Sequence, residues 1–147
     1  MMTKSETNSL RDLVKVLNDG IDFYTEAKDK VNSNAVRLVF ERMSAIREGA
    51  VGRLQPYIVF EKGEKETGHT LGGVLREQYA KILAAIKDNS EHVYIEQLEE
   101  VEDKTLEKIR DAIEEVKAPG VQATLQDIYP TLKRCHDEMS RLQRATA

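Results

Sequence analysis

Apolar side chains recur along this chain with the spacing of a single helix face. In the first such stretch they fall at positions 10, 13, 14, 17, 21, 24, 27 and 31, which lie on one side of a helix. The same pattern predicts helices over residues 9–31, 34–60, 74–88, 91–117 and 121–144, and it leaves residues 1–8 and 145–147 as flexible ends. The sequence therefore predicts an all-α fold.

Capping and turn residues separate these stretches. Ser9 and Asp12 have the spacing of a capping box and predict the start of the first helix. The sequence Asn-Ser-Asn at residues 32–34 ends that helix and caps the second one. Pro130 lies inside the last helix and predicts a bend there, because its ring clashes with the preceding turn.

The second half of the chain repeats the helical plan of the first half. Ala27 corresponds to Ala112 at an offset of 85 residues, and residues 53–55 correspond to residues 141–143, both Arg-Leu-Gln, at an offset of 88. The extra residues fall in the turn between the last two helices. Each half therefore consists of two helices joined by a short turn, which makes an antiparallel hairpin.

The connection between the two hairpins decides how they are arranged. About 30 residues separate the second helix from the fourth, which is enough to run the length of a bundle. We therefore expect one domain over residues 9–144, a four-helix bundle in up-down-down-up order whose long crossover carries a short fifth helix. A continuous coiled coil is the alternative, and the glycine-rich break over residues 61–73 argues against it.

The composition narrows the function classes. Of the 147 residues, 33% are charged and 5% are aromatic, and the formal net charge is −4 with acids and bases interleaved. This pattern argues against a nucleic-acid or anionic-membrane surface, and no apolar run approaches the length of a membrane span. The single Cys135 cannot form an internal disulfide, which fits a reducing compartment and predicts a cytoplasmic location.

One segment of the first hairpin resembles a known family. Residues 19–24 (Asp-Gly-Ile-Asp-Phe-Tyr), followed by residues 40–43 (Phe-Glu-Arg-Met), are similar to the first hairpin of ferritin-like and especially rubrerythrin-related bundles. Residues 18–24, together with Ala27, resemble still more closely a bacterial family of small ferritin-like four-helix-bundle proteins of unknown function. The resemblance extends over residues 9–144 and implies a ferritin-like fold and a bacterial, cytoplasmic, stress-associated protein.

The resemblance also implies where a metal site would lie. In metal-binding members the first and third long helices each contribute a Glu, and the second and fourth each contribute Glu-x-x-His, whose two side chains share one helix face. The corresponding positions in this chain are Leu17, Arg47, Ala50, Glu102, Cys135 and Glu138. Two carboxylates remain where a di-iron site needs four carboxylates and two histidines, so we expect a degenerate site, no catalytic residues and no cofactor.

A reduced or shifted metal site is the alternative. Glu102, Glu138, His136 and Glu48 flank the inward-facing stripes and could together bind iron or another divalent metal for oxidative chemistry. The competing interpretation is that these side chains lie on exposed or half-exposed helix faces.

Three further residues with reactive side chains are expected to be inert. Cys135 lies on the apolar stripe of the last helix, where a buried thiol behaves as a small hydrophobe. His69 in the crossover and His92 near the start of the fourth helix fall outside any Glu-x-x-His spacing. We therefore expect both histidines to be solvated.

Arg47 borders the apolar stripe of the second helix and corresponds to a ligand position in the same central layer as Glu102. A guanidinium there would supply the positive charge that a metal supplies in relatives, through hydrogen bonds to the carboxylate. We therefore predict an ion pair between Arg47 and Glu102 in the core. The alternative is that Arg47 extends along its helix and leaves its charge in solvent.

These observations leave two functions open. The first is a non-enzymatic bundle with a structural or stress-associated interaction role. The second is a metal-binding oxidoreductase-type protein that uses the reduced or shifted site. An inward-facing Arg47 favours the first, because like charges at close range repel strongly in a low-dielectric core.

Residues 57–60 (Tyr-Ile-Val-Phe) are apolar on every side of a helical turn, and a bundle core can bury only part of them. We expect Val74, Leu75 and Tyr79 of the short helix to cover some of this patch. Two-fold self-association through the remainder would make the protein a homodimer.

Overall fold

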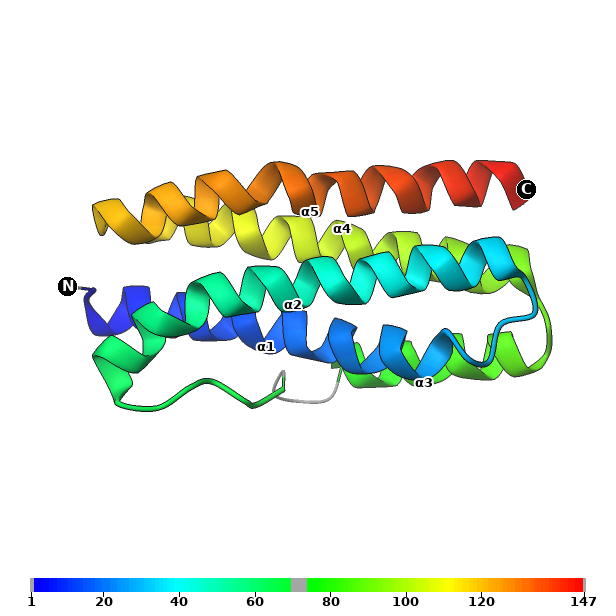
Figure 1. Cartoon of the computed structure of the whole chain (residues 1–147), viewed down its shortest axis with the longest axis horizontal. Helices are drawn as coiled ribbons and strands as arrows, with labels where there is room; N and C mark the ends of the chain where they lie inside the picture. The colour runs from blue at the N-terminus through cyan, green and yellow to red at the C-terminus, as the bar shows by residue number, and fades with distance from the viewer. Residues whose placement is uncertain (1, 70–73, 147) are drawn as a thin grey trace.

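The computed structural model describes residues 2–69 and 74–146, and in these residues the chain is all-α (Figure 1). The described helices are α1 (Lys4–Ala27), α2 (Asn34–Lys62), α3 (Val74–Lys87), α4 (Glu91–Glu115) and α5 (Pro119–Thr146). No strand occurs within these ranges, which confirms the predicted all-α fold. Helix α5 continues through Pro130.

Helix α1 begins earlier than its apolar stripe predicts. Thr3 is its N-cap: the Thr3 hydroxyl accepts a hydrogen bond from the Glu6 amide at 3.1 Å, and the Glu6 carboxylate accepts one from the Thr3 amide at 3.0 Å. The capping box therefore lies here, and its prediction at Ser9 and Asp12 was wrong. Residues 4–8 are helical and not a flexible end, because Thr3 and Glu6 cap the helix with both bonds of a capping box.

The long helices pack in antiparallel pairs whose direction follows from contacts between their side chains. Arg42 pairs with Glu138 and Arg53 with Asp127, eleven residues further along α2 and eleven residues back along α5. Helices α2 and α5 therefore run in opposite directions. Helix α1 packs against both α2 and α4, and α5 against both of them as well.

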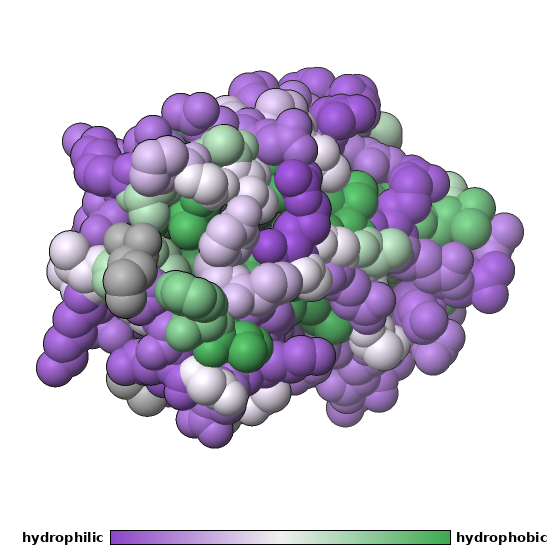
Figure 2. Space-filling model, turned by 60° about the vertical axis from the view of Figure 1, so that its left-hand side comes forward, coloured by the Kyte–Doolittle hydropathy of each residue, from purple (hydrophilic) through white to green (hydrophobic). Residues whose placement is uncertain are grey.

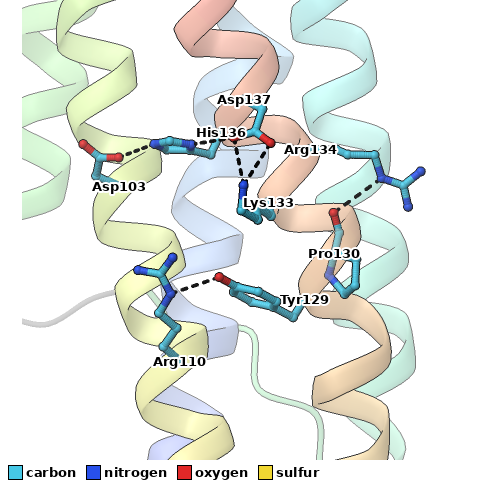
Figure 3. A network of polar contacts seen from close by, with 8 residues as sticks. All are labelled: Asp103, Arg110, Tyr129, Pro130, Lys133, Arg134, His136 and Asp137. Atoms are coloured by element: carbon cyan, nitrogen blue, oxygen red, sulfur yellow. Dashed lines mark hydrogen bonds and ion pairs between the residues drawn. The ribbon is translucent and has the colours of Figure 1, made fainter.

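The α4–α5 seam shows the same kind of pairing at a spacing of one heptad. Asp103 of α4 contacts His136 of α5, and seven residues along α4 the Nε of Arg110 donates to the Tyr129 hydroxyl at 3.0 Å (Figure 3). Because Tyr129 precedes His136 by seven residues, α4 and α5 are antiparallel. The side chains along this seam are mostly charged, so it forms part of the polar surface.

The buried apolar residues form two clusters along the bundle. One is rich in aromatic side chains: the rings of Phe23 and Tyr79 stack with centroids 4.6 Å apart, and those of Tyr24 and Phe40 meet edge to face at 5.2 Å. The other is aliphatic and contains Leu54 and Ile58 of α2. The buried side chains of α3 that the structure describes belong to the aromatic cluster.

The position of α3 corrects one prediction about residues 57–60. Leu75 and Tyr79 pack in the aromatic cluster and do not cover the C-terminal end of α2, where Ile58 belongs to the other cluster. The side chain of Val74 lies outside the described residues. Figure 1 shows the physical reason: from the end of α2 the chain runs back beside α1, and α3 lies in the half of the bundle away from that end.

Residues 63–69, which we call the strap, make this return along α1. The strap begins at Gly63, whose φ of 79° is the left-handed conformation that favours glycine. Gln55 of α2 holds its centre by two hydrogen bonds to the backbone of Glu66, at 2.7 and 2.9 Å. From α1, the Arg11 Nε donates to the Glu66 carboxylate at 2.8 Å, and the Asn18 amide donates to the Gly68 carbonyl at 3.0 Å.

The surface of the molecule is mostly hydrophilic, with scattered hydrophobic patches on the face that Figure 2 shows. The large apolar side chains that are exposed in the described residues are Leu38, Val59, Phe60 and Val93. None of the described helices has the length and apolar character needed to span a membrane.

Candidate functional site in the bundle centre

Each long helix contributes one buried polar or aromatic side chain to a central layer: Tyr24 from α1, Arg47 from α2, Glu102 from α4 and Cys135 from α5. The Arg47 side chain is 0% exposed and that of Glu102 is 1% exposed. Helices α2 and α4 make no close backbone contact with each other in the described residues, so these two side chains meet diagonally across the bundle. The layer therefore joins the α1–α2 hairpin to the α4–α5 hairpin.

The Glu102 carboxylate is the acceptor at the centre of this layer. Its Oε1 accepts a hydrogen bond from Nη2 of Arg47 and a second one from the Tyr24 hydroxyl at 2.6 Å. The guanidinium carbon of Arg47 also lies 5.4 Å from the centroid of the Tyr24 ring, which is within cation–π range. One carboxylate, one guanidinium and one phenol thus form a closed contact among three helices.

Gly20 of α1 makes the room that Arg47 needs. A Cβ at position 20 would stand 2.7 Å from Nε and 2.9 Å from Cδ of Arg47, closer than carbon atoms approach in proteins. Glycine weakens a helix interior by roughly 1 kcal/mol relative to alanine. The close approach of the guanidinium explains why glycine occupies this position.

The central layer contains one buried ion pair, and its phenol and thiol both stay protonated. Burial is the largest single effect and lowers the pKa of Arg47, but the Coulombic effects of Glu102, Tyr79 and Tyr24 together outweigh it. The net pKa is raised, so the guanidinium stays charged. Burial and the Glu102 charge raise the pKa of Tyr24 well above its usual value, so the phenol keeps its proton and donates it. The same two causes raise the pKa of Cys135 to about 12, which keeps this thiol protonated at neutral pH.

The ion pair does not use all of its hydrogen-bonding capacity. In the described part of the chain, the Nε and Nη1 atoms of Arg47 and the hydroxyl of Tyr79 are buried without a hydrogen-bond partner. Each unpartnered buried donor costs on the order of 1–3 kcal/mol. The layer is therefore specific in its geometry but is not optimised for stability.

The four candidates for a shifted metal site lie apart. Glu102 is in the central layer, whereas Glu138 pairs with Arg42 across the α2–α5 seam. His136 lies at the α4–α5 seam between Asp103 and Asp137 (Figure 3), and Glu48 is exposed on α2. In the described residues, no three side chains of His, Cys, Asp and Glu are placed to hold a metal ion.

The segment 18–24 has a role at nearly every position, most of which the sequence pattern alone did not indicate. Asn18 holds the strap, Gly20 accommodates Arg47, and Tyr24 binds Glu102. Phe23 stacks on Tyr79 of α3. One signal in the sequence pointed to this arrangement: a glycine in the middle of a strong amphipathic helix marks close approach of another group.

The histidine of α4 and the histidine of the crossover have different surroundings. His92 is exposed, as expected, and its Nε2 lies 3.7 Å from the Glu96 carboxylate one turn along the same helix. His69 is only partly exposed, and its Nδ1 lies 2.6 Å from Oδ1 of the buried Asp19. The expectation that His69 is solvated was therefore wrong, because the strap brings it back against α1.

Together these features define an α-helical bundle with a buried ionic centre. A family model described as "Domain of unknown function (DUF2383)" matches residues 5–115, and the chain belongs to this family. The match includes α1, α2 and α4, which supply Tyr24, Arg47 and Glu102, while α5 with Cys135 follows it. No curated protein and no solved structure matches this sequence.

Proposed function

We propose that the protein is a ferritin-like bundle in up-down-down-up order in which the pair of Arg47 and Glu102 takes the place of a metal centre. Two observations support this arrangement: α2 is antiparallel to α5, as is α4, and a long crossover joins the two hairpins. In metal-binding ferritin-like proteins, carboxylates and histidines from four helices project into such a centre. Here the four helices supply a phenol, a guanidinium, a carboxylate and a thiol.

The observation that carries the proposal is the buried guanidinium of Arg47. A divalent cation within a few ångströms of this charge would be repelled by several kcal/mol at the effective dielectric constant of a protein interior. In addition, Glu102 already accepts two hydrogen bonds through one oxygen. The layer therefore serves as a structural connection between hairpins and not as a reaction centre.

The role that follows is non-enzymatic. We infer a bacterial cytoplasmic protein with a structural or interaction function, associated with stress responses. The inference rests on the resemblance of residues 18–24 to small ferritin-like bundles and on a single thiol that is kept buried and protonated. Membership of a family whose function is unknown leaves room for this role.

A metal titration tests the structural role of the layer. A ligand that binds the native state and not the unfolded state stabilises the protein, by about 2.7 kcal/mol at a concentration of a hundred times Kd. The unfolding temperature rises as a result. Adding Fe²⁺ or Mn²⁺ to the purified protein should leave the unfolding temperature unchanged. A rise that disappears in the Glu102→Ala variant would contradict the proposal, because it would place the metal in the central layer.

We also propose that the protein self-associates through the C-terminal end of α2. Phe60 is 72% exposed and Val59 is 37% exposed at the end of this helix, and two-fold symmetry lets such a patch cover its own copy. Ile58 is buried in the aliphatic cluster and Tyr57 bonds to Thr124 at 2.9 Å, so neither belongs to the patch.

Sedimentation of a Val59→Glu, Phe60→Glu variant beside the wild type tests this contact. Wild type should sediment as a dimer and the variant as a monomer. Leu38→Glu, at an exposed apolar residue near the start of the same helix, is the matched control and should remain dimeric. A monomeric wild type at high micromolar concentration would rule the dimer out.

A further inference from the structure

The last described residue of the strap lies between two carboxylates of α1. The Nδ1 of His69 is 2.6 Å from Oδ1 of Asp19, and its Nε2 is 3.3 Å from Oδ2 of Asp22. Asp19 is buried, Asp22 is exposed, and the imidazole is partly exposed between them. Both ring nitrogens of His69 thus face an oxygen that can only accept a hydrogen bond.

Only the protonated imidazole can donate a hydrogen to both carboxylates at once. A neutral imidazole carries a single N–H and can donate to one carboxylate, whereas an imidazolium carries two and can donate to both. The other attachments of the strap are made by the amides of Gln55 and Asn18 and by the ion pair of Arg11 with Glu66. The Gly68 amide and Arg11 outweigh the effect of burial and lower the pKa of Glu66, so this pair keeps its charges at neutral pH.

Within the described residues, the groups that line the groove at His69 come from α1 and α3. A groove of about 290 Å³ between α1 and α3 is lined by His69, by the carboxylates of Asp19, Asp22 and Glu26, and by Tyr79. Burial raises the pKa of Tyr79, so this phenol is neutral. The described lining residues include no lysine or arginine. The nearest lysine on α1 that the structure places beside the strap is Lys15, whose Cε lies 3.7 Å from where a Cβ of Gly68 would stand.

We propose that the strap is a pH-sensitive closure, docked on α1 while His69 is protonated and loosened when it is not. The docked strap holds His69 in its imidazolium form. Docking is therefore favoured on the acidic side of neutrality and weakens as the pH rises. Among the side chains that hold the strap in the described structure, an imidazole alone changes its charge between about pH 5 and 8. This device is independent of the role of the central layer, since Arg47 and Glu102 do not take part in it.

Amide hydrogen exchange of Glu66 reports docking directly, because its N–H donates to the side-chain oxygen of Gln55 on α2 at 2.9 Å. Protection factors, corrected for the intrinsic pH dependence of exchange, should fall roughly tenfold between pH 5.5 and 8.5, the loss of one charge-assisted hydrogen bond. Nitrogen chemical shifts of the His69 ring, measured in the same samples, should show loss of one ring proton over the same range.

Two substitutions and a control separate His69 from general effects of pH. His69→Gln should give low protection that no longer changes with pH, and Asp22→Asn, at an exposed side chain that the fold tolerates, should reduce the change. His92→Gln should keep the wild-type profile, because His92 is exposed on α4 and pairs with Glu96 of the same helix. Protection in the wild type that stays constant from pH 5.5 to 8.5 would overturn the proposal, whatever the variants do.

Discussion

Gly20 of α1 and Arg47 of α2 fit together with no space for even one additional carbon atom. A Cβ on any other residue at position 20 would stand only 2.7 Å from Nε of Arg47. This contact places the charge in the bundle centre and directs it toward Glu102. The position of the ion pair therefore depends on a glycine in the neighbouring helix.

Replacing Gly20 by Ala should destabilise the protein by about 1–3 kcal/mol, the usual cost of overfilling a packed core. Helix propensity alone predicts the opposite sign, since Gly→Ala stabilises an open helix position by up to about 1 kcal/mol. Gly52→Ala in α2 is the matched control, because a Cβ there would meet no atom within 4 Å. In denaturant unfolding, the midpoint concentration should fall for Gly20→Ala and rise for Gly52→Ala. Equal shifts of the two midpoints would contradict the close fit of Gly20 and Arg47.

Removing Glu102 should leave the Arg47 charge buried without a partner. We expect Glu102→Ala to cost about 3 kcal/mol, within the range for breaking a buried ion pair. It also removes the acceptor of the Tyr24 hydroxyl. The combined variant Arg47→Met, Glu102→Leu, Tyr24→Phe should recover most of the loss, because it replaces unpartnered donors by apolar groups. If Glu102→Ala unfolds at the wild-type denaturant concentration, the pair is not buried in solution.

Glu6 should make the stability depend on pH in the acidic range. Hydrogen bonds from the backbone amides of Thr3, Lys117 and Ala118 lower the pKa of Glu6 to about 2, against a smaller opposing effect of burial. Because the folded state holds this carboxylate ionised, its contribution is present above about pH 4.5 and is lost as the pH falls toward 2.

Thermal unfolding of Glu6→Gln beside the wild type checks this dependence. The variant should be less stable at pH 7, and the difference should close between about pH 4.5 and 2. Glu6→Asp keeps the charge but shortens the reach to the α4–α5 turn, so it should resemble Glu6→Gln at pH 7. A stability difference that persists unchanged at pH 2 would show that Glu6 acts through packing instead.

Cys135 should react slowly with thiol reagents in the native state. Its side chain is buried, and burial together with the Glu102 charge raises the pKa of the thiol to about 12, so very little thiolate exists at pH 8. Labelling should become fast in denaturant, at the rate of a model thiol. Rapid labelling of the folded protein would show an accessible thiol and would contradict the packing of α5 against the central layer.

Much of the fold follows from the sequence, because amphipathic periodicity reports directly which helix faces are buried. The pairing of Arg47 with Glu102 was also accessible, since both occupy positions that bundles of this kind turn inward. The sequence misplaced the start of α1 because Thr3 and Ser9 both have an acidic residue three positions later, and periodicity does not choose between caps.

The contacts of the strap were not accessible from the sequence. They depend on where a non-helical segment runs, and local patterns carry no information about that path. His69 therefore looked solvated, although Asp19 lies beside it in the fold. The same reason explains why α3 was expected near residues 57–60: without the path of the strap, the end of α2 and the start of α3 look adjacent.

Elemental analysis of the untagged protein, purified without added metal or chelator, tests the central claim most directly. If the Arg47 guanidinium occupies the centre and pairs with Glu102, iron and manganese should be present at far below one ion per chain. A content of about two ions per chain, as in a di-iron bundle, lost in the Glu102→Ala variant, would contradict the account.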